Sequence, residues 1–330
     1  MKKKITIVGA GISGLYLAYL LEEKFDVTIL EARDRVGGRI YSIDGHDMGP
    51  SWIWSHHKEM LQLIQTLGLE IFSQYTQGYA LYDTKDKVEH FMPQSSMPSR
   101  RVNGSLGSLI DILKKSLKQT NIFLSQVVQS IHHETDKVVV KTQTQSYESD
   151  FSIVTLPPRL ALNLDLYPKL PEALHVKMAN TATWMGHSAK CVIEFKSSFW
   201  REQGLSGFAF SHNGPLVEIH DASTATKAAL FGFVSSNANM QNFKQSITEQ
   251  LVRIFKIDPT QILSIHLVDW RDEQYTASFE DRRPLSTHLE YGINTNSYSD
   301  KILFSATEFS FKEGGYLEGA ILRAQEIAHF

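Results

Sequence analysis

The feature that most constrains the fold is a short apolar run at residues 5–8, followed at once by three glycines with the spacing G-x-G-x-x-G. The run predicts a buried parallel strand. Each glycine predicts a separate local property: a tight turn at Gly9, a close approach of the backbone to a pyrophosphate at Gly11, and a helix packed close to the strand at Gly14. The stretch therefore predicts the first turn of a dinucleotide site.

A helix and a second strand continue this pattern. Leucines and alanines over residues 12–21 predict the helix, with Ser13 in its first turn, and its N-terminal N–H groups would face phosphate oxygens. Residues 27–30 predict a second strand that ends at Glu31, about 20 residues after the glycines, where a carboxylate would accept hydrogen bonds from ribose hydroxyls. The glycines alone are a weak signal, but strand, helix, strand and acid together predict a dinucleotide-binding unit.

A second glycine turn directly after the acid distinguishes FAD from NAD. It contains Ala32, Arg33, Arg35, Gly38 and Arg39. The guanidinium groups of its three arginines could form forked hydrogen bonds with phosphate oxygens. An ordinary NAD site has no need of this turn. The stretches Gly-Ala-Gly-Ile-Ser-Gly-Leu and Leu-Glu-Ala-Arg-Asp-Arg-Val-Gly-Gly-Arg closely resemble the flavin-containing amine oxidases, relatives of monoamine and polyamine oxidase. The resemblance implies FAD as the cofactor.

This resemblance spans almost the whole chain through five separated motifs. Residues 47–52 are similar to a segment that passes beside the flavin ring, and residues 127–128 to a strand whose backbone meets the adenine. Residues 302–308 resemble a strand that ends at the ribityl chain, and residues 314–320 a helix whose N-terminus points at the flavin pyrimidine oxygen. The implied cofactor contacts are Gly49, Ser51, Trp52, Val128, Trp270, Glu308 and Leu317. For Trp52 core packing remains an alternative, because a tryptophan buries a large area wherever it lies.

Lys190 is the sharpest catalytic candidate. It begins a segment of alternating apolar residues that leads to Phe199 and Trp200, and this arrangement is similar to a Lys-x-x-x-x-aromatic pattern of the family. The resemblance implies that the lysine holds a water at the flavin N5. An ordinary solvated lysine on a strand is the alternative.

Tyr316 is the second catalytic candidate, because it matches one wall of the aromatic cage that the family builds in front of the flavin. Such a cage attracts an amine nitrogen and excludes water. Phe279 stands where mammalian monoamine oxidases have their flavin-linking cysteine, and Glu280 where they have the second tyrosine of the cage. The resemblance therefore implies FAD bound without a covalent bond and a cage that lacks its second wall, as in polyamine-type and demethylase-type relatives.

The order of elements predicts an α/β fold with a discontinuous Rossmann-like FAD-binding domain and a smaller substrate domain built on a mixed or antiparallel sheet. Residues 179–270 contain several short alternating strands, interrupted by one helix with an apolar face at 240–254. Residues 76–101 are polar and irregular, which indicates an excursion from the cofactor domain. We assign residues 1–75, 102–178 and 271–330 to the FAD-binding domain, and 76–101 and 179–270 to the substrate domain.

Charge and composition exclude several classes of partner. The formal net charge of −3 leaves no basic field for nucleic acid and no polybasic patch for a membrane. No run reaches the about 18 apolar residues of a transmembrane helix, and the chain stops after its last helix, where membrane-bound family members carry an anchor. We expect a small-molecule partner, an amine. Because residues 76–101 replace a longer insertion of the larger oxidases, we expect an open site or one closed by a second subunit of a homo-oligomer.

Cysteine and histidine usage completes the expectations. The single cysteine, Cys191, excludes an internal disulfide and suits a reducing compartment such as the cytoplasm. The apolar run after Met-Lys-Lys-Lys contains the glycine fingerprint, so we interpret it as mature protein and not as a signal peptide. The pairs His56-His57 and His132-His133 lack the spacing of known metal motifs. We expect surface or capping histidines and no metal.

The favoured function is oxidation of an amine, with hydride transfer from the carbon beside the nitrogen to flavin N5 and reoxidation by oxygen or another acceptor. A desaturase or porphyrinogen-type oxidase on the same scaffold is one alternative. A flavin-binding protein without turnover is another, because a fold does not by itself define a reaction. The sequence does not identify the substrate, the electron acceptor or the oligomeric state.

Overall fold

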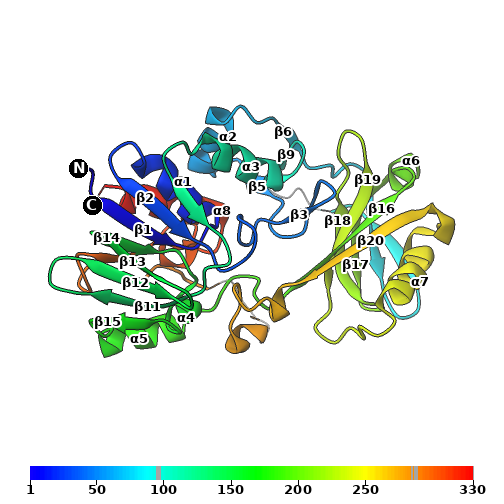
Figure 1. The fold of residues 1–330 in the computed structure, drawn as a ribbon. Coiled ribbons are helices and arrows are strands. Elements are labelled where there is room, and N and C mark those ends of the chain that lie inside the picture. Colours follow the sequence, from blue (N-terminus) through cyan, green and yellow to red (C-terminus); the bar gives the residue numbers. More distant parts are fainter. Residues whose placement is uncertain (94–97, 284, 286–288, 330) are drawn as a thin grey trace.

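The computed structural model of the chain describes residues 1–93, 98–283, 285 and 289–329. It has two lobes, each built around its own sheet, and both termini belong to the lobe at the left of Figure 1. We call this the first lobe. The second lobe, at the right of Figure 1, surrounds a seven-stranded sheet.

The first lobe contains a parallel sheet of five strands in the order β10-β2-β1-β14-β21. The chain forms β1 and β2 on either side of the helix α1, so the predicted strand, helix and second strand are confirmed. Their apolar residues are buried on both faces, because helices cover one face and a second, four-stranded sheet covers the other. The strands are β1 (Lys4–Val8), β2 (Asp26–Leu30), β10 (Asn121–Phe123), β14 (Phe151–Val154) and β21 (Ile302–Phe304).

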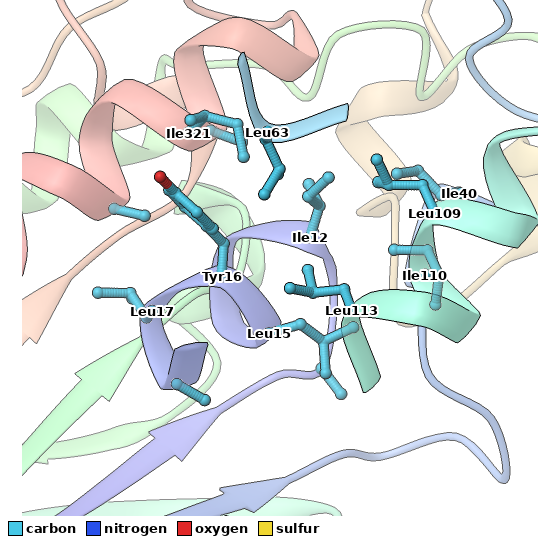
Figure 2. Close-up of a cluster of buried hydrophobic side chains, with 14 of the residues drawn as sticks. Ile12, Leu15, Tyr16, Leu17, Ile40, Leu63, Leu109, Ile110, Leu113 and Ile321 are labelled. Carbon is cyan, nitrogen blue, oxygen red and sulfur yellow. The ribbon is translucent and has the colours of Figure 1, made fainter. Parts of the chain in front are cut away.

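Four helices form one apolar cluster with this sheet. The side chains of α1 lie between those of α3 on one side and those of α2 and α8 on the other (Figure 2). Leu15 and Leu17 of α1 are fully buried, and burying a leucine side chain contributes about 1.5–3 kcal/mol. This packing fixes the start of α1 relative to the start of α8. The helices are α1 (Ile12–Leu21), α2 (Lys58–Thr66), α3 (Leu106–Ser116) and α8 (Leu317–Ile327).

A four-stranded sheet lies beside the parallel sheet, with two helices at its edge (Figure 1). Its strand order is β13-β12-β11-β15, and the predicted turn is present, since the N–H of Glu134 donates to the carbonyl oxygen of Lys137 at 2.9 Å. These elements are β11 (Val128–His133), β12 (Val138–Thr142), β13 (Ser146–Ser149), β15 (Asp165–Tyr167), α4 (Pro158–Ala161) and α5 (Glu172–Ala179).

The sheet of the second lobe has the order β20-β16-β19-β18-β17-β7-β8. Its neighbouring strands are antiparallel except for β17 and β7, so the predicted mixed, mainly antiparallel sheet is confirmed. Apolar residues of α7 pack into its core. The elements are β7 (Tyr79–Asp83), β8 (Val88–Phe91), β16 (Ala189–Phe195), β17 (Leu205–Ser211), β18 (Leu216–Asp221), β19 (Ala228–Val234), β20 (Ile262–Asp269), α6 (Phe199–Glu202) and α7 (Phe243–Phe255).

Shorter elements join these parts. Two small sheets have the orders β3-β4 and β5-β9-β6. Their strands are β3 (Ser42–Ile43), β4 (His46–Asp47), β5 (Ile53–Trp54), β6 (Ile71–Ser73) and β9 (Ser99–Val102). The 3₁₀ helices are Pro259–Gln261, Trp270–Asp272, Phe279–Arg282 and Thr307–Phe309. No helix in the described ranges combines the length and the apolarity that crossing a bilayer requires.

The prediction of irregular structure over residues 76–101 was wrong. The segment forms β7 and β8 and most of β9, while its residues 94–97 lie outside the described part of the chain. Pairing explains the difference, because β7 lies parallel to β17, a strand from far along the chain that the sequence analysis did not predict. The helix predicted from residue 240 begins only at Phe243, and Met240 is exposed.

Candidate active site

A cavity of about 1150 Å³ is lined by residues of both lobes. This volume exceeds the range of about 300–1,000 Å³ that is usual for a site holding one small ligand. Of the predicted site residues, Gly14 and Glu308 do not line it, and the others do. Those that line it are Gly9, Gly11, Ser13, Glu31, Ala32, Arg33, Gly38, Arg39, Gly49, Ser51, Trp52, Val128, Lys190, Trp270, Tyr316 and Leu317.

The first glycine turn has the geometry of an anion cradle. Gly9 has a φ of 104°, and a Cβ on Gly14 would lie 2.0 Å from the carbonyl oxygen of Gly9, so the helix lies as close to the turn as predicted. A Cβ on Gly11 would meet nothing within 4 Å, and Gly11 lines the cavity. The N-cap residue of α1 is Gly11, which has no side chain to cap the helix. Open space in front of an uncapped helix N-terminus fits a pyrophosphate.

The second glycine turn lies directly against the first. The N–H of Gly37 donates to the carbonyl oxygen of Ala10 at 2.8 Å, and a Cβ on Gly38 would lie 3.2 Å from the Cα of Gly11. Only backbone without side chains can approach this closely at both turns. The two predicted glycine stretches therefore form one continuous cradle.

Glu31 is buried on the cavity wall, and two backbone donors orient its carboxylate. Oε2 accepts the N–H of Ala10 at 2.7 Å, and Oε1 accepts the N–H of Arg33 at 2.9 Å. A carboxylate can accept about four hydrogen bonds, so further acceptor capacity is available toward the cavity. This arrangement is suited to ribose hydroxyls.

The arginines of the second turn are paired with protein groups. Arg33 donates to Glu273 at 2.9 Å and to Thr276 at 2.8 Å, while Arg35 donates to the carbonyl oxygen of Gly38 at 3.1 Å. These bonds use only part of the five N–H donors of each guanidinium group, so forked bonds from them to phosphates stay a prediction.

Arg39 and Glu308 form the deepest of these pairs. The guanidinium nitrogens of Arg39 donate to both carboxylate oxygens of Glu308, at 2.7 and 3.2 Å, and the side chain of Glu308 is fully buried. Glu308 does not line the cavity, whereas its partner Arg39 does. The pair orients the Arg39 guanidinium group at the cavity wall, and the contact of Glu308 with the cofactor stays a prediction.

Lys190 lies on β16 at the point where the second lobe meets the first. It is 3% exposed, and its Nζ donates to the carbonyl oxygen of Gly49 at 2.8 Å and to the hydroxyl oxygen of Ser51 at 2.6 Å. Nζ also lies 4.2 Å from the centroid of the Phe231 ring. Burial lowers the pKa of Lys190 to about 7, with the charge of Asp47 opposing this shift. A solvated strand lysine is therefore excluded.

Residues 48–52, which accept the hydrogen bonds of Lys190, are held in place by hydrogen bonds of Trp270 and of their own Trp52. The indole N–H of Trp270 donates to the carbonyl oxygen of Met48 at 2.9 Å, and a Cβ on Gly49 would lie 2.0 Å from the carbonyl oxygen of Arg39. Trp52 donates to Gln74 at 3.0 Å and packs in a cluster of apolar side chains while it also lines the cavity. Trp52 therefore packs in the core on one side and lines the cavity on the other, so neither interpretation excludes the other.

An aromatic group surrounds Tyr316, which precedes α8. The centroid of its ring lies 5.4 Å from that of Trp54, 5.8 Å from that of His57 and 6.4 Å from that of Trp184. All four line the cavity. Phe279, the residue at the position of the family's linking cysteine, is 73% exposed and does not line it. The sequence analysis did not single out Trp54 or Trp184, because nothing in their local sequence shows that they meet Tyr316.

The histidine pairs differ from each other. His132 pairs with Asp165 at 3.0 Å near the surface, as predicted for a surface histidine. His57, in contrast, is 1% exposed although it occupies the N-cap position of α2, and its side chain does not cap the helix. The prediction of a surface or capping role was therefore wrong for His57. Its burial results from packing against Trp54 and Tyr316.

Cys191 is fully buried in the apolar core of the second lobe, as predicted for a structural thiol. Burial raises the pKa of this thiol, which keeps it protonated and unreactive. It does not line the cavity. Because it is the only cysteine of the chain, a cysteinyl bond to a flavin is not available.

The parallel sheet, the paired glycine turns and the oriented acid define a dinucleotide-binding protein of the Rossmann class. The sequence profile described as flavin containing amine oxidoreductase matches residues 12–99 and 90–329. Flavin-containing amine oxidase B of Mus musculus is 22% identical over 451 residues, covering 99% of this chain and 86% of the relative. The probable flavin-containing monoamine oxidase A of Dictyostelium discoideum is 22% identical and covers 96% of this chain and 94% of that protein.

Solved structures show the same fold. Putrescine oxidase bound to putrescine superposes with a TM-score of 0.84 at 19% identity, and cyclohexylamine oxidase from Brevibacterium oxydans IH-35A with a TM-score of 0.83 at 18% identity. Each covers 100% of this chain and 98% of its own. The chain belongs to the flavin-containing amine oxidoreductase family. It is an FAD-dependent oxidoreductase of amines, and the desaturase-type alternative is not favoured.

Proposed function

We propose that the chain oxidises an amine inside the cavity, with Lys190 and Tyr316 as its catalytic residues. The observation that carries this proposal is the buried Lys190, which lines the cavity and whose Nζ bonds to the Gly49–Ser51 segment of the other lobe. An amine with a pKa of about 7 can hold or release a proton near neutral pH. When bound, FAD accepts the hydride that leaves the carbon beside the amine nitrogen.

Backbone groups of the first lobe would bind the cofactor. The uncapped start of α1 and the adjoining glycine turn supply N–H donors for the phosphates, and Glu31 supplies acceptors for the ribose. The start of α8 likewise has no side-chain cap, and Leu317 at this end lines the cavity. We assign the cofactor contacts to Gly9, Gly11, Ser13, Glu31, Ala32, Gly38, Arg39, Gly49, Ser51, Trp52, Val128, Trp270 and Leu317.

The aromatic side chains would receive the amine. Tyr316 and Trp184 offer ring faces from two different segments, and such faces attract an amine nitrogen while they exclude water. Exclusion of water also lowers the pKa of a bound ammonium group, which favours the neutral amine. The neutral form is the reactive one, because its nitrogen lone pair must be free when hydride leaves. We assign the missing second wall of the cage to Trp184.

The proposed division into domains follows the sheets except at β9, which pairs with β5 and β6 of the first lobe. We propose an FAD-binding domain of residues 1–75, 102–178 and 271–330 and a substrate domain of residues 76–101 and 179–270. Support comes from β7 and β8, which belong to the same sheet as the strands between Ala189 and Asp269. The single, structurally buried cysteine supports our proposal that the protein works in a reducing compartment such as the cytoplasm.

An anaerobic scan of amines tests the proposed function. Primary amines, secondary amines and diamines are mixed separately with the FAD-loaded protein, and bleaching of the flavin absorbance is recorded. At least one class should reduce the flavin, and admission of oxygen or an artificial acceptor should restore the colour. If no amine bleaches the flavin while an apolar ring or polyene does, the reaction is that of the desaturase-type alternative.

A further inference from the structure

Three side chains that the proposed reaction does not require meet where α2 and α8 begin. His56 and His57 directly precede α2, and Glu313 precedes the turn that leads to Tyr316. One nitrogen from each imidazole and one carboxylate oxygen lie within 4.8 Å of one another. Glu313 is far from the histidines along the chain, so the sequence spacing gave no sign of this cluster.

Two separations in this cluster, each from an imidazole nitrogen to an oxygen of Glu313, match ligands around one ion better than they match hydrogen bonds. Nε2 of His57 lies 3.4 Å from Oε2 of Glu313, and Nε2 of His56 lies 3.5 Å from the same oxygen. Two ligands of a tetrahedral Zn²⁺ ion, each about 2.0–2.1 Å from the metal, are about 3.3–3.4 Å apart. Around an octahedral ion with similar bond lengths, neighbouring ligands are only about 3.0 Å apart.

His57 is the least satisfied member of the cluster. Neither of its ring nitrogens has a hydrogen-bond partner among the described residues, although the side chain is 1% exposed. A buried polar atom without a partner is destabilising, so a ligand at this position would be stabilising. His56, by contrast, is 44% exposed, which gives an ion access from solvent and lets its ring adjust.

The surrounding charge also favours a cation. The positive N-terminal end of α2 is already occupied by Glu318, whose carboxylate oxygens accept the N–H groups of Glu59 and Met60 at 3.1 and 2.8 Å. Glu318 and Glu59 therefore add negative charge beside Glu313.

We propose that His56, His57 and Glu313 form a Zn²⁺ site with a solvent molecule as the fourth ligand. Two imidazoles and one carboxylate are a donor set that zinc uses where one position stays open. The all-oxygen preference of Mg²⁺ and Ca²⁺ does not match it.

The ion would connect two segments that carry the aromatic group. His57 contacts Tyr316 by its ring, and the carbonyl oxygen of Glu313 accepts the N–H of Tyr316 at 3.1 Å. A bound ion would fix both the start of α2 and the turn before α8. The position of Tyr316 on the cavity wall would then depend on the metal.

Metal titration of the FAD-loaded protein, prepared without a histidine tag and stripped with a chelator, tests this proposal. Calorimetry with Zn²⁺ should give one site per chain, and Co²⁺ should give the intense visible bands of a tetrahedral ion. His57→Gln and Glu313→Gln should each weaken binding at least about tenfold. The matched control is His132→Gln, which should bind Zn²⁺ like the wild type, because His132 and His133 are neighbours on a strand and point to opposite faces.

Three results would overturn the site: no Zn²⁺ binding by the wild type, equal binding by Glu313→Gln, or a weak Co²⁺ spectrum of octahedral type. Glu313 is partly exposed, so Glu313→Gln decides the question even where His57→Gln does not fold. Flavin absorbance is recorded on the same samples. Retained, amine-reducible flavin together with absent Zn²⁺ binding refutes the metal site alone, whereas Zn²⁺ binding without reduction by any amine refutes only the proposed function.

Discussion

Lys190 of β16 donates a hydrogen bond of 2.6 Å to the hydroxyl oxygen of Ser51, and this contact joins the second lobe to the first. The bond places a buried amine on the wall of the cavity, at the junction of the two lobes. Because β16 pairs along its whole length with β19 and β20, the lysine has little freedom to move away. The predictions that follow from this geometry begin with Lys190 itself.

Lys190→Met should slow the flavin reaction and leave FAD bound. The change removes the titrating nitrogen at similar volume, so we expect reduction or reoxidation to slow by about tenfold or more, equivalent to ~1.4 kcal/mol. Stopped-flow absorbance measures both half-reactions separately. Lys196→Met on the same segment, beyond the end of β16, is the control and should react like the wild type. If Lys190→Met is reduced and reoxidised at normal rates, Lys190 has only a structural role.

Lys190 should contribute to the pH dependence of the free energy of unfolding. Its pKa is about 7 in the folded protein and about 10.4 in an unfolded chain, so between these values the unfolded state binds more protons. The free energy of unfolding of the apoprotein should therefore gain a contribution that rises as the pH increases from about 7 to about 10. Denaturant titrations over this range should show a smaller rise for Lys190→Met. Identical pH profiles would mean that Lys190 stays protonated in the fold.

Glu31→Gln should weaken retention of FAD by about 1–3 kcal/mol, the usual effect of losing a charge-assisted bond to a buried polar group. Folding should survive when FAD is in excess, since the amide still accepts one backbone N–H. Equilibrium binding of FAD to the apoprotein measures the change. Glu273→Gln removes a carboxylate that pairs with the Arg33 guanidinium group without altering the cavity wall, and should retain FAD far better. Equal affinities for the two variants would contradict the role of Glu31.

Local sequence patterns predicted the parts of the site that form locally. The glycine turn, α1 and Glu31 lie within one continuous stretch, and the required backbone conformations are properties of the glycines themselves. The buried Lys190 could also be anticipated from its apolar neighbours on a predicted strand. These predictions depend on contacts within one segment or on a known motif.

Contacts between distant segments could not be predicted in this way. His57 is adjacent to an exposed histidine in sequence, and only the folding of α8 beside α2 buries it against Tyr316. Similarly, the sequence shows an acid at Glu308 but not that Arg39 neutralises it. The strand β7 was missed because its pairing partner, β17, is remote and contains polar residues and a glycine. Tertiary pairing decides such cases over local propensity.

Denaturation should release all of the FAD. The only cysteine is buried in the core of the second lobe, away from the cavity, so the thioether link of some relatives has no counterpart in this chain. Acid precipitation followed by absorbance of the supernatant measures the released flavin. Yellow colour that stays with the precipitated chain would show a covalent link to another side chain.

The final prediction concerns the aromatic group around Tyr316. Tyr316→Leu and Trp184→Leu should each lower the rate of flavin reduction by an amine about tenfold or more, ~1.4 kcal/mol, while FAD stays bound, because both residues line the cavity in which we propose that the amine reacts. In the wild type the rate should rise with pH until the bound amine is fully deprotonated, since only the free lone pair permits hydride to leave. Phe279→Leu is the matched control, because that ring is exposed and outside the cavity. A reduction rate that is independent of pH, or one that Phe279→Leu lowers as much as Tyr316→Leu does, would show that the amine does not react in front of Tyr316.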